Sequence, residues 1–86
     1  NLEKVGKDLD KEILRAGIIA ELDAINLYEQ MAAMTKNDLI RKMLLDIAKE
    51  EKTHMGEFQT LLLKEDEEQL KELEAGKKEV IELMEE

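Results

Sequence analysis

Two long helical patterns, separated by one four-residue polar break, constrain the fold of this chain more than any other feature. Apolar residues recur at helical spacing over residues 8–34 and again over residues 38–63. A break as short as residues 35–38 makes two consecutive helices antiparallel neighbours. Within it, Asn37 has the side chain expected of an N-cap for the second helix. The sequence therefore predicts a helical hairpin.

The rest of the chain predicts only a short third helix. Asp66-Glu67-Glu68-Gln69 resembles a capping box, and the helix that it opens is expected to cover residues 67–75. Gly76 is expected to end this helix and to leave residues 77–86 as a charged tail. Residues 1–7 are expected to be a frayed lead-in. Since proline is absent and Val, Tyr and Phe are too few for a sheet, residues 1–86 are expected to form one all-α domain.

The charge of the chain argues against several classes of partner. A net charge of -9 is unsuited to nucleic acid, which requires a basic surface, and to anionic membrane surfaces. No apolar run approaches the roughly 18–20 residues of a membrane-spanning helix. The absence of cysteine rules out disulfides, thiolate metal sites and iron–sulfur clusters, and it fits the cytoplasm. Because the first residue is Asn1 and not Met, we expect the chain to be part of a longer protein.

Each long helix carries one carboxylate near the centre of its apolar stripe. With side chains placed at about 100° per residue, Glu51 lies in the middle of the apolar face of the second helix. His54 lies on the same face, about 60° away, and Glu21 has the matching position on the first helix. No Lys or Arg lies near them on either stripe, although burying an unpartnered carboxylate costs several kcal/mol. A shared proton, a water network or a metal ion could satisfy these groups.

Two carboxylates and one imidazole suit Fe²⁺, Mn²⁺ or Zn²⁺ better than Mg²⁺ or Ca²⁺. Di-metal carboxylate sites in four-helix bundles take one Glu from each of two helices and a Glu-x-x-His from each of the other two. This hairpin supplies half of that set: Glu21 from one helix, and Glu51 with His54 from the other. Two copies related by a two-fold axis would complete both the ligands and the bundle. The first helix is also apolar beyond this stripe, which favours a homodimer and a larger assembly.

Each of these residues also has a simpler interpretation. The chain contains sixteen glutamates, so one of them could precede the single His by three residues by chance, with water satisfying the whole group. Tyr28, two turns after Glu21, is either a hydrogen-bond or redox neighbour of the site or an ordinary core aromatic residue. Asp23 and Glu50 flank the ligand positions, where they either pass cations inward or form part of the solvated surface.

Two segments carry a family resemblance. ELDAINLYEQMA (Glu21–Ala32) and AKEEKTHMGEF (Ala48–Phe58) resemble the encapsulated ferritins, the two-helix relatives of ferritin and rubrerythrin. The resemblance covers about residues 8–75 and rests on Glu-x6-Tyr followed, about thirty residues later, by Glu-Glu-x-x-His. Among the encapsulated ferritins, the chain is most similar to versions that are fused to the N-terminus of an encapsulin shell protein.

The resemblance implies a ferroxidase whose di-iron site, with two Fe per dimer, forms at a homodimer interface. It implies Glu21, Glu51 and His54 as ligands, with Glu51 bridging and Tyr28 beside them. It also implies that two-fold dimers assemble into a ring, commonly a decamer, inside a cytoplasmic encapsulin nanocompartment. There Fe(II) would be oxidised with O2 and stored as mineral.

The chain departs from some relatives at two positions. Ala20 stands where they have a second acidic residue, and Leu27 stands where they have a Trp. In those relatives an outer site passes metal to the centre. In this stretch of the chain, Asp23 is the only carboxylate of that outer site that remains.

Two other functions stay open. A rubrerythrin-like di-iron peroxidase would use the same ligands on hydrogen peroxide, although such proteins usually carry a rubredoxin centre built from four cysteines, and this chain has no cysteine. A non-catalytic helical assembly or adaptor module for a shell would bind no iron at the interface.

Overall fold

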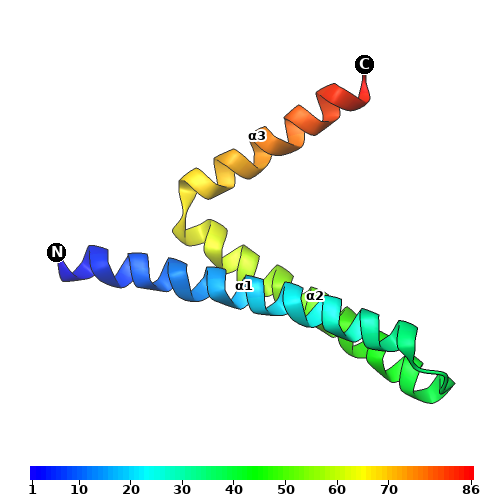
Figure 1. Cartoon of the computed structure of the whole chain (residues 1–86). Helices are drawn as coiled ribbons and strands as arrows, with labels where there is room; N and C mark the ends of the chain where they lie inside the picture. Colours follow the sequence, from blue (N-terminus) through cyan, green and yellow to red (C-terminus); the bar gives the residue numbers. More distant parts are fainter.

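The computed structural model describes residues 1–86 and consists of three α-helices without strands. Helix α1 covers Leu2–Met34, α2 covers Asp38–Glu65 and α3 covers Glu67–Met84. α1 and α2 lie side by side as an antiparallel hairpin, and α3 leaves the far end of α2 at an angle (Figure 1). This arrangement confirms the predicted all-α hairpin with a third helix. None of the three helices combines the length and the apolarity that a membrane-spanning segment needs.

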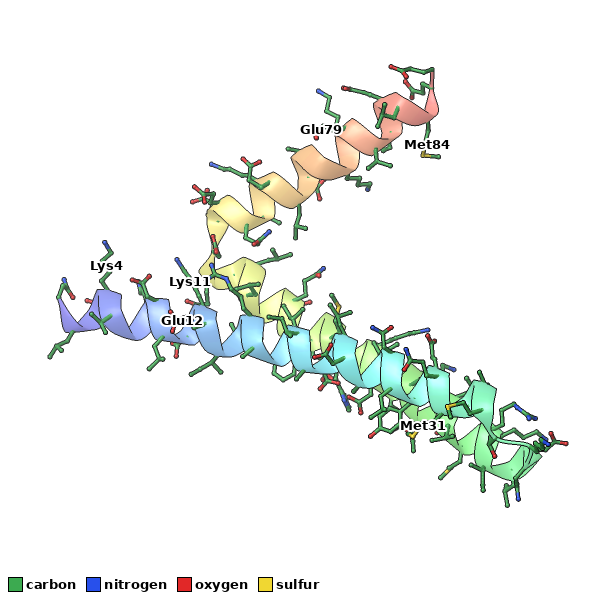
Figure 2. All side chains as sticks on the ribbon, viewed as in Figure 1. Lys4, Lys11, Glu12, Met31, Glu79 and Met84 are labelled. Atoms are coloured by element: carbon green, nitrogen blue, oxygen red, sulfur yellow. The ribbon has the colours of Figure 1, made fainter.

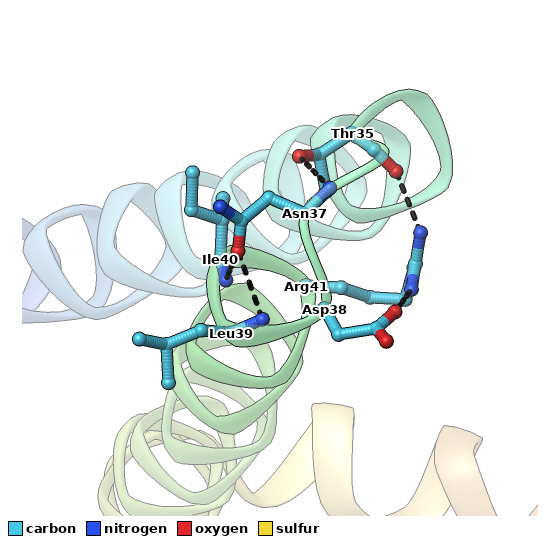
Figure 3. A network of polar contacts seen from close by, with 6 residues as sticks. All are labelled: Thr35, Asn37, Asp38, Leu39, Ile40 and Arg41. Atoms are coloured by element: carbon cyan, nitrogen blue, oxygen red, sulfur yellow. Dashed lines mark hydrogen bonds and ion pairs between the residues drawn. The ribbon is translucent and has the colours of Figure 1, made fainter.

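The turn between α1 and α2 is closed by hydrogen bonds from both helix ends (Figure 3). The side-chain oxygen of Asn37 accepts from the backbone N–H groups of Leu39 at 3.0 Å and Ile40 at 3.1 Å, so Asn37 is the N-cap that the sequence predicts. Arg41 donates to the carbonyl oxygen of Thr35 at 2.6 Å. Free backbone groups at both helix ends are thereby satisfied, which holds the turn in one conformation.

The beginning of α1 differs from the prediction of a frayed segment over residues 1–7. α1 already begins at Leu2, because the side chain of Asn1 caps it by accepting from the N–H groups of Glu3 and Lys4. Residues 2–7 contain no proline, and with a cap in place they continue the helix that follows.

The third helix is also longer than predicted. It continues through Gly76 to Met84 and does not end at residue 75, so residues 77–84 are helical and not a tail. Gly76 does not adopt a positive φ, so it makes no C-cap turn here. An interior glycine costs a helix only about 1 kcal/mol relative to alanine, and the Lys, Glu and Leu residues around it offset that cost. Figure 2 shows the side chains of Glu79 and Met84 on a part of α3 that no other helix covers.

The chain leaves an unusually large share of its surface uncovered. It extends over 53 × 44 × 14 Å, and its radius of gyration is 17.1 Å, whereas a compact domain of this length has about 12 Å. Its accessible surface is 7068 Å², about 1,900 Å² more than the roughly 5,200 Å² of a compact monomer of this mass. Only four residues are buried, and all belong to α1 or α2: Ile25, Ala32, Ala48 and Leu62. The hairpin therefore has a narrow seam and no closed core.

Asp66 joins α2 to α3 and ties both to α1. Its carboxylate accepts from the backbone N–H of Gln69 at 3.0 Å and from the Arg15 guanidinium at 2.9 Å. The Gln69 N–H holds the pKa of this carboxyl below its usual value, and Arg15 and the positive charge of Lys11 act in the same direction. The angle between α3 and the hairpin therefore depends on an ionised carboxylate.

Replacing Asp66 with Asn removes the negative charge but keeps the helix cap, because Asn caps helices as well as Asp does. We expect the Asp66→Asn variant to have a lower melting temperature than the wild type above about pH 5, where Asp66 is ionised. A lowered folded-state pKa stabilises the protein above the unfolded pKa, and this contribution is lost as the pH falls through the folded value. The difference should therefore shrink as the pH falls through the lowered pKa of Asp66 in the folded protein. Thermal unfolding followed by circular dichroism at several pH values tests this, and equal melting temperatures at pH 7 would contradict it.

Candidate metal centre

Three predicted ligand residues meet across the hairpin. Glu21 comes from the middle of α1, and Glu51 and His54 lie one turn apart on α2. The Nδ1 atom of His54 lies 3.7 Å from Oε1 of Glu21 and 3.6 Å from Oε2 of Glu51. These distances are longer than a hydrogen bond, so the three groups do not satisfy one another. One ligand atom from each residue lies within 4.8 Å of the other two.

One oxygen of this cluster lacks any partner. The Oε2 atom of Glu21 is buried and makes no hydrogen bond. The side chains of Glu21 and Glu51 are only 16% and 20% exposed. A buried carboxylate oxygen without a partner loses its hydration without compensation, which is rare in folded proteins and calls for a proton, a water molecule or a cation.

The donor atoms fit a first-row divalent metal ion. Oxygen and nitrogen ligands about 2.0–2.2 Å from one ion lie about 3.0–4.3 Å from each other. The two distances at His54 fall within that range, and the cluster as a whole is only slightly wider. Two carboxylates and one imidazole are the mixture of hard oxygen and borderline nitrogen that such ions accept. Three ligands from one chain also leave coordination positions for ligands from outside it.

His54 is more exposed than its place on the apolar stripe predicts. Its side chain is 47% exposed and that of Glu51 is 20% exposed, so in the single chain only Glu51 of the two is largely covered. The reason is geometric, because the apolar stripe of α2 is wider than the surface that α1 covers. Ala48 and Leu62 lie on the side of Glu51 that packs against α1, whereas His54 lies on the other side.

The uncovered side of the hairpin carries further apolar side chains around His54. We call this surface the open face and define it by its exposed members: Ile13 of α1, and Met43, His54 and Leu61 of α2. Met43 and Leu61 are 60% and 51% exposed, and Leu61 follows His54 by seven residues, or two helical turns. The candidate metal centre therefore lies at the edge of an uncovered apolar surface and not inside a closed core.

The other predicted site residues lie outside the cluster. Tyr28 is half-buried on α1, two turns after Glu21. Asp23 and Glu50 are exposed, next to the helix positions that carry the ligands. Neither packing nor ion pairs assign a role to these three residues.

Two contacts beside the cluster are not apparent from helical periodicity. Lys52 donates to Glu29 at 3.1 Å, which ties α2 to α1 one residue after Glu51, and nothing in the sequence singles out this pair. The ring of Phe58 lies directly against Gly17. A glycine inside a strong helical pattern was the signal that could have revealed this second contact.

Known proteins resemble this chain in sequence and in fold. The profile of the Rubrerythrin family matches residues 12–85. The crystal structure of the encapsulated ferritin domain from Pyrococcus furiosus matches with a TM-score of 0.88 and 60% identity, covering 90% of this chain and 79% of that one. The chain belongs to the encapsulated ferritin family. The resemblance that the sequence suggests is thereby confirmed.

A curated relative contains a similar segment within a longer protein. The ferritin-like-encapsulin shell fusion protein of Pyrococcus furiosus is 62% identical over 72 residues. These residues make up 84% of this chain but only 21% of the relative. The match to this chain thus spans about a fifth of that relative's length.

Proposed function

We propose that this encapsulated ferritin domain is a ferroxidase that oxidises Fe(II) to Fe(III) with O2 at a di-iron site shared by two copies of the chain. The observation that carries the proposal is the cluster of Glu21, Glu51 and His54, with one unpartnered oxygen, at the edge of the open face. The donor set alone is compatible with Fe²⁺, Mn²⁺ or Zn²⁺. Membership of the encapsulated ferritin family favours iron among them.

The second copy supplies the other half of the site. Four-helix di-iron proteins use four carboxylates and two histidines, and one hairpin offers half of each. The excess surface of about 1,900 Å² lies within the range that each partner of an obligate homodimer buries. An isologous pair that joins two open faces brings the two clusters together and covers the exposed apolar residues.

The residues have distinct roles in this centre. The negative charges of four carboxylates balance the positive charges of two Fe²⁺ ions. Bound substrate therefore neutralises carboxylates that repel one another when the site is empty. Glu21, Glu51 and His54 of each copy would hold the iron, with Glu51 as the bridging carboxylate that the family resemblance implies. We assign Tyr28, two turns along α1 from Glu21, the role of a hydrogen-bond or redox neighbour, and exposed Asp23 and Glu50 the role of attracting cations from solvent. Each pair of Fe²⁺ ions gives up two electrons, which O2 takes with two protons to become H2O2.

The product Fe(III) feeds iron storage in an encapsulin nanocompartment. Support comes from the relatives, one a ferritin-like domain fused to an encapsulin shell and the other an encapsulated ferritin domain. We infer that this domain likewise works next to a shell protein, as two-fold dimers arranged in a ring, with a decamer as the expected size. The high negative charge of the chain suits a surface that gathers Fe²⁺.

Anaerobic titration with Fe²⁺, followed by native mass spectrometry, tests the shared site. We expect one iron per chain, two per dimer, and a shift towards dimers or larger rings as iron is added, because metal links the two halves. Iron bound to monomers, or no iron bound, would contradict the proposal. Admitting O2 should then oxidise the bound iron rapidly.

The choice of oxidant distinguishes the proposed ferroxidase from a peroxidase. The match to the Rubrerythrin family makes a peroxidase the second candidate. Loaded protein should be oxidised faster by O2 than by an equal concentration of hydrogen peroxide if it is a ferroxidase. The opposite order of rates would identify a peroxidase.

A further inference from the structure

Gly17 is the one glycine of the chain at which a side chain would meet another residue. A Cβ atom built there would lie 3.1 Å from each of three ring carbons of Phe58: Cδ1, Cε1 and Cζ. At Gly6, Gly56 and Gly76 the same atom would meet nothing within 4 Å. The ring of Phe58 therefore occupies the space that any larger residue at position 17 would need.

The backbone offers no other reason for this glycine. Gly17 lies in the interior of α1, and no residue of the chain has a positive φ, so an ordinary L-residue could adopt its conformation. Glycine is a much weaker helix former than alanine, which makes it an unfavourable choice in the middle of a helix. Its structural contribution here is the missing side chain, which allows the ring to approach the backbone of α1.

The contact between Gly17 and Phe58 lies one turn from the metal centre on both helices. Gly17 precedes Glu21 by four residues on α1, and Phe58 follows His54 by four residues on α2. Because residues four apart lie on the same helix face, this contact and the metal ligands belong to neighbouring layers of one seam. Any change in the spacing of the helices at one layer therefore changes the spacing at the other.

We propose that Gly17 and Phe58 are positioning residues that set the separation of α1 and α2 at the metal centre, and with it the distance between Glu21 and the two ligands on α2. The inference rests on the proposed function of this centre. At 3.1 Å a methyl group is too close to the ring, so the ring or the helix must move by a few tenths of an ångström. Metal sites tolerate errors of only about 0.2 Å in ligand distance, so a shift of this size matters for the metal.

Gly17→Ala tests the proposal with Co²⁺ as an oxygen-stable probe of the site. We expect the 86-residue chain carrying Gly17→Ala to bind Co²⁺ about ten-fold more weakly than the wild type, with a changed visible d–d absorption spectrum. Circular dichroism should show undiminished helix content, because alanine favours helix formation. A loss of affinity and a changed spectrum in a helical protein are effects that a purely structural role would not produce.

Further variants complete the experiment. Gly56→Ala makes the same substitution two residues from His54, where space is free, and should leave Co²⁺ affinity and spectrum unchanged. The double variant Gly17→Ala/Phe58→Leu removes the ring that the methyl group meets and should restore both readouts. If Gly17→Ala does not fold, the single variant Phe58→Leu decides: weaker Co²⁺ binding with a changed spectrum supports the spacing, and wild-type affinity and spectrum overturn it.

The outcomes separate this inference from the function on which it rests. Wild-type affinity and an unchanged spectrum in Gly17→Ala would overturn the positioning role while leaving the metal centre intact. Failure of the wild-type chain to bind either Co²⁺ or Fe²⁺ would overturn the proposed function itself.

Discussion

We expect Glu51→Ala and His54→Ala to lose rapid oxidation of Fe²⁺, with rates at least about 100-fold below the wild type. Changing a residue that only supports a metal ligand already lowers metal affinity or activity about 10–100-fold, and removing a ligand lowers it further. In a two-fold dimer each substitution also acts twice, because both copies contribute the same residue. Stopped-flow absorbance after mixing the loaded protein with O2 measures the rate.

The helices should survive both substitutions. Neither side chain makes a hydrogen bond shorter than 3.5 Å within the cluster, and alanine is the better helix former. Glu57→Ala provides the control, because Glu57 is an exposed glutamate on the same helix that lies outside the cluster. It should oxidise iron like the wild type. Normal rates in both Glu51→Ala and His54→Ala would remove these residues from the centre.

The second large effect is expected from a charge on the open face. Leu61→Lys places an ammonium group two turns from His54, at a position that the proposed dimer buries twice. Burying two unpaired lysines should cost about 3 kcal/mol or more, which corresponds to at least about 100-fold weaker dimerisation. Analytical ultracentrifugation should find monomers at concentrations where the wild type is dimeric, and iron uptake should fall with the dimer.

A matched control distinguishes the open face from apolar surface in general. Leu45 is also on α2 and is 47% exposed. Because it precedes Glu51 by six residues, its side chain points away from the ligand stripe. Leu45→Lys should therefore keep the two-fold dimer and its two iron ions. Dimers of normal stability in Leu61→Lys would show that the open face is not the interface and that the two halves of the centre meet elsewhere.

Much of this fold follows from short-range signals in the sequence. The polar break at residues 35–38 and the cap at Asn37 act over a few residues, so they could be recognised without knowledge of the tertiary structure. The same holds for Glu21, Glu51 and His54, because helical periodicity places each of them on an apolar stripe. Their grouping within 4.8 Å follows once the two stripes face each other.

Helix ends were harder to predict than helix faces. A single cap at Asn1 decides whether residues 2–7 are helical, and a single glycine at position 76 is too weak a signal to end α3. Both ends depend on differences of about 1 kcal/mol, which neighbouring residues can reverse.

By itself, the sequence determined that the chain forms a hairpin of amphipathic helices with a metal-binding pattern, because periodicity and capping are local properties. Only the tertiary structure decided which part of each stripe is buried, since that depends on how two helices rotate and approach each other. It placed His54 at the edge of the open face, tied α3 to α1 through Arg15 and Asp66, and packed Phe58 against Gly17. These contacts join residues up to 51 positions apart, and their geometry arises from the packing of whole helices and not from any local pattern.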